Sequence, residues 1–196
     1  MSAPLPPADL DRRSLELVNL SAGTILERFH TASHDPIFFD RSRDGRLNAP
    51  DGSYGVLYAA DGLRGAFAET FLQTPGRTLL PLDLVYVKAR ARLRVVRELR
   101  LVRLSGTGLA RAGATAEVTH GSLPYDIPQA WSKALRAHPI KPDGIFYTSR
   151  HDDEAGCFAL FGHLPSCVAV EERIPDLDAD WFWALAALYG VGMAPF

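Results

Sequence analysis

The 196-residue sequence has little cysteine and no marked excess of charge of either sign. Its two cysteines, Cys157 and Cys167, are too few for a secreted disulfide scaffold, and we interpret them as reduced core thiols. The formal net charge of -2 gives no general attraction to nucleic acid, so direct DNA or RNA binding is not expected. Hydrophobic residues make up 47% of the chain, which is enough to bury a core.

Features of membrane and exported proteins are also missing. The first residues, Met1 to Ala8, contain no basic region followed by an apolar one, so no signal peptide is expected. Residues 181–196 are apolar and uncharged but fall short of the ~20 residues that cross a bilayer. We therefore expect a cytoplasmic protein without membrane association, whose C-terminus is either a buried helix or a surface for a partner.

Several widespread catalytic motifs do not occur. There is no Gly-rich loop ending in Gly-Lys-Ser/Thr, no His-Glu-x-x-His or Cys-x-x-Cys pair, and no Gly-x-Ser-x-Gly elbow. P-loop phosphate chemistry, a zinc site and a serine hydrolase are thereby disfavoured, and no metal is indicated. Gly62 and Gly65 are too sparse for a Rossmann fingerprint, although NAD could be bound in another way.

The hydrophobic pattern predicts a single α+β domain with mainly antiparallel strands and flanking helices, because strands and helices mix without a βαβ rhythm. Turn-forming residues fill 38–55 and predict a long loop. The predicted strands are 56–60, 82–87, 93–96, 99–104, 144–148 and 166–170. The predicted helices are 11–20, one capped by Asp61 and ended by Pro75-Gly76, one capped by Asp126, and 181–189.

Three short blocks lie where irregular segments meet regular ones. They are Asp44-Gly45-Arg46-Leu47-Asn48-Ala49-Pro50, then Gly55 to Asp61 followed by Glu69, and finally Asp143-Gly144-Ile145-Phe146-Tyr147-Thr148-Ser149-Arg150. Each also has an ordinary interpretation: Arg46 as a solvated loop arginine, Tyr58 as core, Glu69 as a solvated helix residue, and Ser149 as a strand-end hydroxyl.

Taken in order, the blocks resemble the RES family, which is named for an arginine, a glutamate and a serine that fall at Arg46, Glu69 and Ser149. The resemblance covers about residues 24–172 and includes an earlier Arg28-Phe29-His30 element on an expected strand. It divides the chain into an N-terminal extension, 1–20, and a RES domain, 21–196, that ends in the apolar helix. Two departures, Leu47 in place of a common aromatic and Ala49 before Pro50, bear on the shape of the loop.

The resemblance implies an ADP-ribosyltransferase-like fold and cleavage of the nicotinamide–ribose bond of NAD⁺, which is a substrate here. It further implies a toxin of a bacterial toxin–antitoxin module, paired with a cognate antitoxin of helix-turn-helix type, and a possible homodimer. His30 and Tyr147 are expected as neighbours of the NAD⁺ pocket.

The residue types suit this chemistry. Guanidinium groups bind phosphate oxygens in a bidentate way, so Arg28 and Arg46 are assigned to the pyrophosphate. An aromatic face stabilises the cationic nicotinamide ring, a role assigned to Tyr58. Cleavage passes through an oxocarbenium-like ribose, which a carboxylate stabilises, and Glu69 is assigned to it. Ser149 is expected to hydrogen-bond near the nicotinamide ribose.

The acceptor of the ADP-ribose stays open at this point. We favour water or phosphate, which would make the protein an NAD⁺-depleting enzyme through hydrolysis or phosphorolysis. The alternative, a side chain of a cytosolic protein, would make it a mono-ADP-ribosyltransferase. A different interpretation is a non-catalytic interaction module that docks through its aromatic C-terminus, which contains Trp181, Phe182, Trp183, Leu185, Leu188 and Tyr189.

Overall fold

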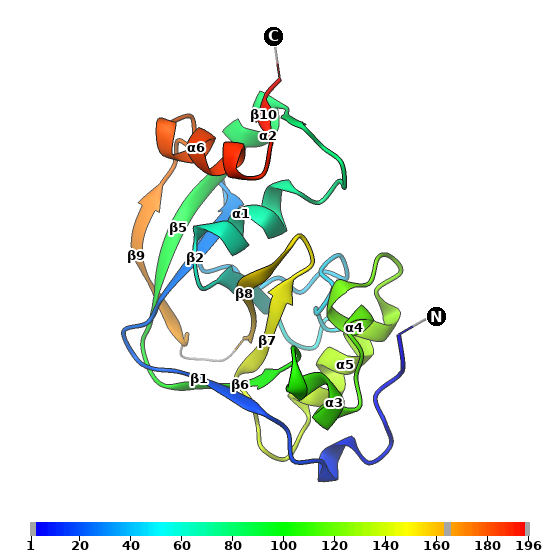
Figure 1. Cartoon of the computed structure of the whole chain (residues 1–196). Helices are drawn as coiled ribbons and strands as arrows, with labels where there is room; N and C mark the ends of the chain where they lie inside the picture. The colour runs from blue at the N-terminus through cyan, green and yellow to red at the C-terminus, as the bar shows by residue number, and fades with distance from the viewer. Residues whose placement is uncertain (1–2, 163–165, 195–196) are drawn as a thin grey trace.

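A computed structural model describes residues 3–162 and 166–194, and its centre is a curved eight-stranded sheet (Figure 1). The strand order is β1-β6-β7-β8-β3-β2-β5-β9, and every neighbouring pair is antiparallel except β6 and β7. Its strands are β1 Leu17–Leu20, β2 Ile25–Thr31, β3 Val56–Ala60, β5 Lys88–Val95, β6 Leu99–Arg103, β7 Gly144–Ser149, β8 Asp152–Phe161 and β9 Val168–Ile174. The expected α+β fold with a mainly antiparallel sheet is confirmed.

Helices cover the sheet in two groups, one at each end of the view in Figure 1. The group near the C-terminus holds α1 Leu63–Phe71, α2 Leu82–Tyr86 and α6 Asp180–Leu188, beside a small parallel pair of β4 Leu79–Leu80 and β10 Gly192–Met193. The other group holds α3 Thr107–Ala112, α4 Glu117–His120 and α5 Asp126–Arg136, with the 3-10 turn η1 Leu10–Arg12 nearby.

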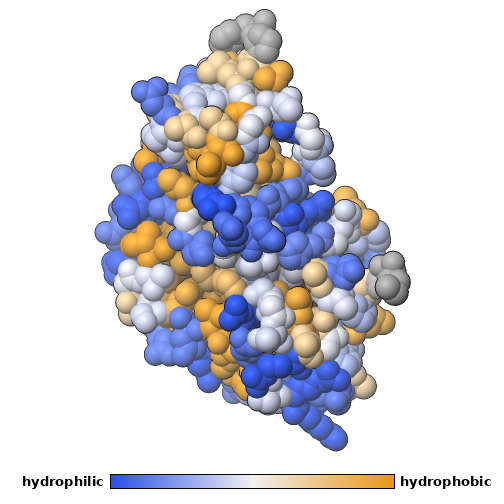
Figure 2. All heavy atoms as spheres, viewed as in Figure 1, coloured by the Kyte–Doolittle hydropathy of each residue, from blue (hydrophilic) through white to orange (hydrophobic). Residues whose placement is uncertain are grey.

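The C-terminal helix α6 is part of the hydrophobic core. Phe182 is fully buried, and its ring lies 6.2 Å from Phe29, 5.5 Å from Phe67 and 5.2 Å from Phe71. Burying an aromatic side chain in such a cluster is worth about 3–5 kcal/mol against alanine. The helix also leaves Leu188 exposed, and Figure 2 shows hydrophobic residues at this end of the molecule. Of the expected tail, residues 195–196 lie outside the described part.

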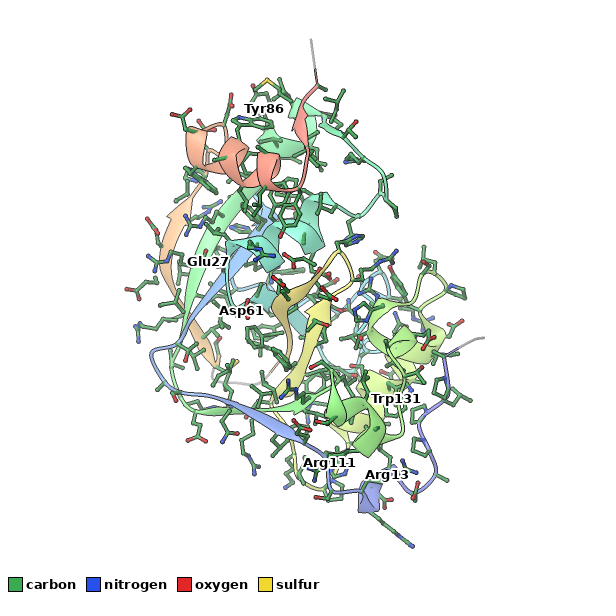
Figure 3. The ribbon with its side chains drawn as sticks, viewed as in Figure 1. Arg13, Glu27, Asp61, Tyr86, Arg111 and Trp131 are labelled. Carbon is green, nitrogen blue, oxygen red and sulfur yellow. The ribbon has the colours of Figure 1, made fainter. Side chains whose placement is uncertain are left out.

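The second helix group is fixed around Trp131 of α5, which is labelled in Figure 3 and is fully buried. Its indole Nε1 donates a hydrogen bond to the carbonyl of Pro4 at 2.7 Å. The N-terminal segment is thereby tied to α5, and β1 that follows it pairs with β6 from Leu17 opposite Val102 to Leu20 opposite Leu99.

Local patterns led to several wrong predictions. Residues 11–20 are not a helix but the end of η1 followed by β1, because pairing with β6 outweighs their helical spacing. Residues 82–86 form helix α2 directly after Pro81, where a strand was expected. The long strand β8 was not predicted, although it pairs with both β7 and β3.

Element ends also differ from the predictions. Asp61 does not cap α1, whose N-cap is Gly62; its Oδ2 instead accepts a hydrogen bond from the amide of Gly156 at 3.1 Å. The helix ends at Phe71, before Pro75-Gly76, and α5 begins at Asp126 itself, with Tyr125 as its N-cap. Within residues 3–162 and 166–194, no helix is long and apolar enough to cross a membrane.

Candidate active site

A cavity opens where the central sheet splits between β2 and β3. These strands share a single register pair, Glu27 with Ala60, whereas β3 pairs with β8 along all five of its residues. Beyond that pair Arg28 reaches across the gap, and its Nη1 donates to the carbonyl of Tyr58 at 3.3 Å. The cavity has a volume of about 490 Å³, a size usual for small-molecule sites. Its walls come from β2, β3, β5, β7, β8, α1, the 38–55 loop and the segment before α5. They include Glu27, Arg28, Phe29, Asp40, Gly45, Arg46, Tyr58, Glu69, Lys88, Tyr125, Tyr147 and Cys157.

Arg46 is not a solvated loop arginine. Its side chain is only 9% exposed; Nη1 donates to the carbonyl of Thr119 at 2.8 Å and Nε to that of Gly121 at 3.2 Å. The guanidinium also lies over the ring of Tyr125, 5.6 Å from its centroid. Helix α4 and the segment after it therefore fix the direction of this arginine, while the 38–55 loop supplies its backbone.

Asn48 holds that loop in shape from its interior. The side chain is fully buried, and its Nδ2 donates to Asp40 Oδ2 at 2.9 Å and to the carbonyl of Ser42 at 3.0 Å. Its Oδ1 accepts from the hydroxyl of Tyr58 at 2.9 Å, which ties the loop to β3. A Cβ on Gly45 would lie 2.4 Å from this amide, so only glycine fits there. The predicted long loop is thus an ordered wall of the cavity.

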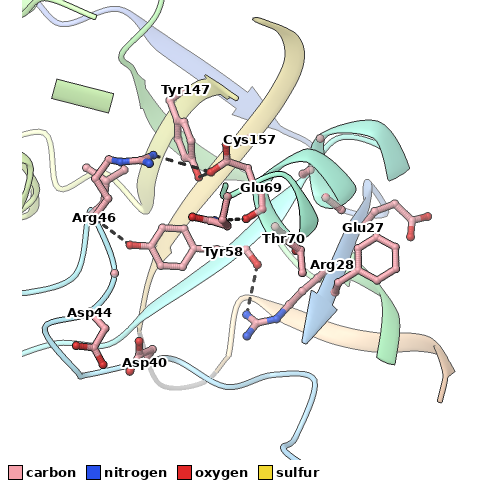
Figure 4. A pocket seen from close by; sticks show the side chains of 18 of the residues that line it. Glu27, Arg28, Asp40, Asp44, Arg46, Tyr58, Glu69, Thr70, Tyr147 and Cys157 are labelled. Atoms are coloured by element: carbon pink, nitrogen blue, oxygen red, sulfur yellow. Dashed lines mark hydrogen bonds and ion pairs between the residues drawn. The ribbon is translucent and has the colours of Figure 1, made fainter. Parts of the chain in front are cut away.

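Glu69, in the last turn of α1, is contacted by both other family-naming residues, and Figure 4 shows it with Arg46 and Tyr147 at the cavity. Its Oε1 accepts a hydrogen bond from Ser149 Oγ at 2.7 Å, and its Oε2 lies 3.9 Å from Arg46 Nη1. The hydroxyl of Tyr147 donates to Oε2 at 3.5 Å. The carboxylate is 22% exposed and lines the cavity. Arg46 from the 38–55 loop and two residues of β7 therefore hold one carboxylate of α1 at the cavity wall.

Ser149 reaches Glu69 because it lies two residues after Tyr147 on β7, and the alternation of a strand turns both side chains to the same face. The β7–β8 register shifts directly before Ser149: Thr148 lies opposite Gly156, but Ser149 lies opposite Asp152. Ser149 is fully buried, its Oγ also accepts from the amide of His151 at 3.2 Å, and it is not among the residues that line the cavity. Its observed contact is therefore with Glu69.

Two tyrosines keep their protons at this end of the cavity. Burial, followed by the negative charge of Glu69, raises the pKa of Tyr147 well above its ordinary value. Burial likewise raises the pKa of Tyr58, whose hydroxyl accepts from the amide of Leu47 at 2.8 Å while it donates to Asn48. Both hydroxyls remain hydrogen-bond donors at neutral pH, and the ring of Tyr58 is held as part of the wall.

The two remaining predicted residues, Arg28 and His30, are neighbours on β2 in different surroundings. Arg28 lines the cavity, and burial lowers its pKa to about 10. His30 is 3% exposed, its Nδ1 lies 2.9 Å from the carbonyl of Thr31, and it is not among the lining residues. Burial lowers the pKa of His30 as well, so the ring is neutral at pH 7.

Several residues of the site were not singled out from the sequence. Tyr147 was named only as a neighbour, and the structural role of Asn48 was not foreseen although it stands in the first block. Tyr125 and Lys88 carry no local signal, because only the fold brings them to the cavity. Among the described residues, no group of three or more His, Cys, Asp or Glu side chains is placed to hold a metal ion.

Comparison with known proteins shows the family to which the chain belongs and a solved structure that it resembles. The family model of the RES domain matches residues 25–182, and the chain therefore belongs to the RES family. Among solved structures it is similar to a chain of the MbcT–MbcA toxin–antitoxin complex of M. tuberculosis, with 14% sequence identity and a TM-score of 0.66. The match covers 86% of this chain and 92% of that chain. At this identity it establishes a shared fold, and no curated protein matches significantly.

Proposed function

We propose that this chain is the toxin of a toxin–antitoxin module and cleaves the nicotinamide–ribose bond of NAD⁺. The observation that carries the proposal is the meeting of Arg46, Ser149 and Glu69 at a cavity of about 490 Å³. Membership of the RES family and a fold shared with a chain of a toxin–antitoxin complex support it. We also propose a cognate antitoxin as the partner.

The contacts suggest how the residues divide the work. The C–N glycosidic bond breaks and its electron pair leaves with the nicotinamide ring, so positive charge develops on the ribose. Glu69 stabilises that charge, because a carboxylate in a partly dry cavity interacts strongly with a nearby cation. Ser149 acts as a positioning residue through its 2.7 Å hydrogen bond to Glu69, which departs from its expected contact with the ribose.

Other lining residues suit the nicotinamide ring and the phosphate groups of NAD⁺. The ring of Tyr58 offers a flat face to the cationic nicotinamide, and Arg28 offers its guanidinium group to phosphate oxygens. Arg46, which was also expected at the pyrophosphate, lies 3.9 Å from Glu69 and is held by two backbone carbonyls, so in this scheme it acts beside the reacting ribose. His30 lies outside the lining and has no part in this scheme. Water, phosphate or a protein nucleophile captures the ribose carbon, and mono-ADP-ribosylation of a protein remains the alternative outcome at the same site.

The direct test is nicotinamide release from NAD⁺ by the purified chain, with and without phosphate and with and without cell lysate. Glu69→Gln keeps the shape and an acceptor for Ser149 but removes the charge, and we expect release to fall at least about a hundredfold. Glu98→Gln, an exposed glutamate between β5 and β6, is the matched control. Release that requires lysate would favour protein modification.

The proposal can fail in the test tube or in cells, and the two failures mean different things. A folded chain that releases no nicotinamide under any of these conditions would contradict the catalytic proposal. Expression in cells separates the two parts of the proposal: growth arrest by the native chain and not by Glu69→Gln ties toxicity to the reaction. Growth arrest by both variants would point to a toxic interaction instead.

A further inference from the structure

Two cations in the cavity wall, Arg28 and Lys88, have no ion-pair partner among the described residues, unlike Arg46 and Glu27 of the same wall. Arg46 lies 3.9 Å from Glu69, and Glu27 accepts two hydrogen bonds from Arg90 at 2.9 and 3.0 Å. Figure 3 labels Glu27 where β2 lies beside β5. In residues 3–162 and 166–194, by contrast, no ion pair within 4.0 Å joins Arg28 or Lys88 to an acidic side chain.

Arg28 and Lys88 have hydrogen-bond donors that no group in the described part of the chain accepts from. Arg28 Nη1 donates to the carbonyl of Tyr58 at 3.3 Å, while its buried Nε has no partner. Lys88 is the first residue of β5, paired in register with Thr31, and its Nζ makes one long contact of 3.4 Å to Thr31 Oγ1. An ammonium carries three donors and a guanidinium five, so both side chains can bind a further acceptor.

The two cations also act on each other. Burial is the first cause that lowers the pKa of Lys88, and the positive charge of Arg28 is the second. Asp40 is the acid that acts on Arg28, but its carboxylate already accepts hydrogen bonds from Asn48 and from the amide and hydroxyl of Ser42. Two like charges in a partly dry wall destabilise the empty cavity, and an anion between them would relieve that repulsion.

Arg28 and Lys88 lie away from Glu69, the carboxylate at which the proposed reaction takes place. Figure 4 shows Arg28 and Arg46 on opposite sides of Tyr58, with Glu69 above it. One substrate could therefore present its glycosidic bond to Glu69 and another of its groups to Arg28. In a nicotinamide dinucleotide, the diphosphate is the anionic group that lies beyond the reacting ribose.

We propose that Lys88 joins Arg28 at the diphosphate, and that this second cation selects dinucleotide over phosphate-free nicotinamide nucleoside. The geometry supports an anion site in its own right, whereas the identity of the anion rests on the proposed function. Lys88 is thus a specificity residue contributed by a strand, β5, that carries none of the family-naming residues.

Calorimetric binding of ADP-ribose, which needs no turnover, tests the subsite. Lys88→Met keeps the apolar stem and removes the charge, and we expect at least about tenfold weaker binding, the scale of one charge-assisted hydrogen bond. Lys88→Arg should bind within about threefold of the native chain because it keeps a cation. Lys133→Met, an exposed lysine on α5 that pairs with Asp51, should be unchanged.

Kinetics supply the second measurement. With NAD⁺, Lys88→Met should raise KM about tenfold and leave kcat within about threefold, whereas turnover of nicotinamide riboside should not change. Equal ADP-ribose binding by the native chain and Lys88→Met, or no binding by the native chain, would overturn the subsite. Binding that depends on Lys88 in a chain that releases no nicotinamide would keep the subsite and reject the proposed reaction.

Discussion

At the Glu69 end of the cavity the charged side chains are fixed by hydrogen bonds and an ion pair, whereas at the Arg28 end they have few contacts. Glu69 is contacted by Ser149, Tyr147 and Arg46, and Arg46 is itself held by two backbone carbonyls. Arg28 has one backbone contact and an unpartnered Nε. The first end is organised before any ligand arrives, which suits a group that must meet developing charge. The second is left to be completed by a ligand.

The same difference separates two ways of losing function. A substitution at the organised end removes a contact that already exists and misplaces Glu69. A substitution at the Arg28 end removes a contact that forms only with a ligand, so folding should be unaffected or improved. Stability and activity should therefore respond differently at the two ends, and three variants test this.

The largest effect is expected for Ser149→Ala. Loss of its 2.7 Å hydrogen bond leaves Glu69 with the longer contact from Tyr147, and kcat should fall on the order of 10–100-fold with little change in KM. Ser105→Ala removes another buried serine hydroxyl, which accepts from Arg103, and should leave kcat unchanged. Steady-state nicotinamide release measures both. A rise in KM alone would place Ser149 at the substrate and not behind Glu69.

Asn48→Ala should cost stability in addition to activity. It deletes hydrogen bonds to Asp40 and Ser42 and the one from Tyr58, all at a buried position, which predicts a loss of about 2–3 kcal/mol in the free energy of unfolding. Urea denaturation measures it, with the exposed Asn19→Ala on β1 as control. A loss no larger than that of the control would show that the loop is not held from within.

The smallest effect on folding is expected for Arg28→Met. Its removal deletes an unpaired cation from the wall, so the free energy of unfolding should stay within about 1 kcal/mol or rise. ADP-ribose affinity should nevertheless fall at least about tenfold. The same denaturation and calorimetry check both. A destabilisation of several kcal/mol would mean that Arg28 holds β2 and β3 together, and the contrast between the two ends would fail.

Much of the fold could be predicted where local pattern and final environment agree. The run 56–60 is buried on both faces of a central strand, and Leu63, Phe67 and Phe71 follow one helix. Prediction failed where a contact with a segment distant in the sequence determines the local structure. Residues 17–20 become a strand because β6 lies beside them, and Asp61 turns from α1 to the amide of Gly156 on β8, a strand that was itself not expected.

The site shows the same limit. Arg46, Glu69 and Ser149 could be named from motifs, but their contacts could not, since these depend on α1 lying beside β7 and on two carbonyls after residue 118. His30 has the right neighbours in sequence but lies outside the cavity lining. Lys88 has no motif at all and is placed only by the pairing of β5 with β2.

The aromatic cluster of Phe182 with Phe29, Phe67 and Phe71 affects when the cavity can form during synthesis. It joins α6, near the end of the chain, to Phe29 on β2, and Phe29 lines the cavity. A ribosome makes β2 well before α6, so this wall has no backing until α6 has left the exit tunnel. The cavity is therefore completed only after synthesis has passed α6, although most of its lining residues are made long before.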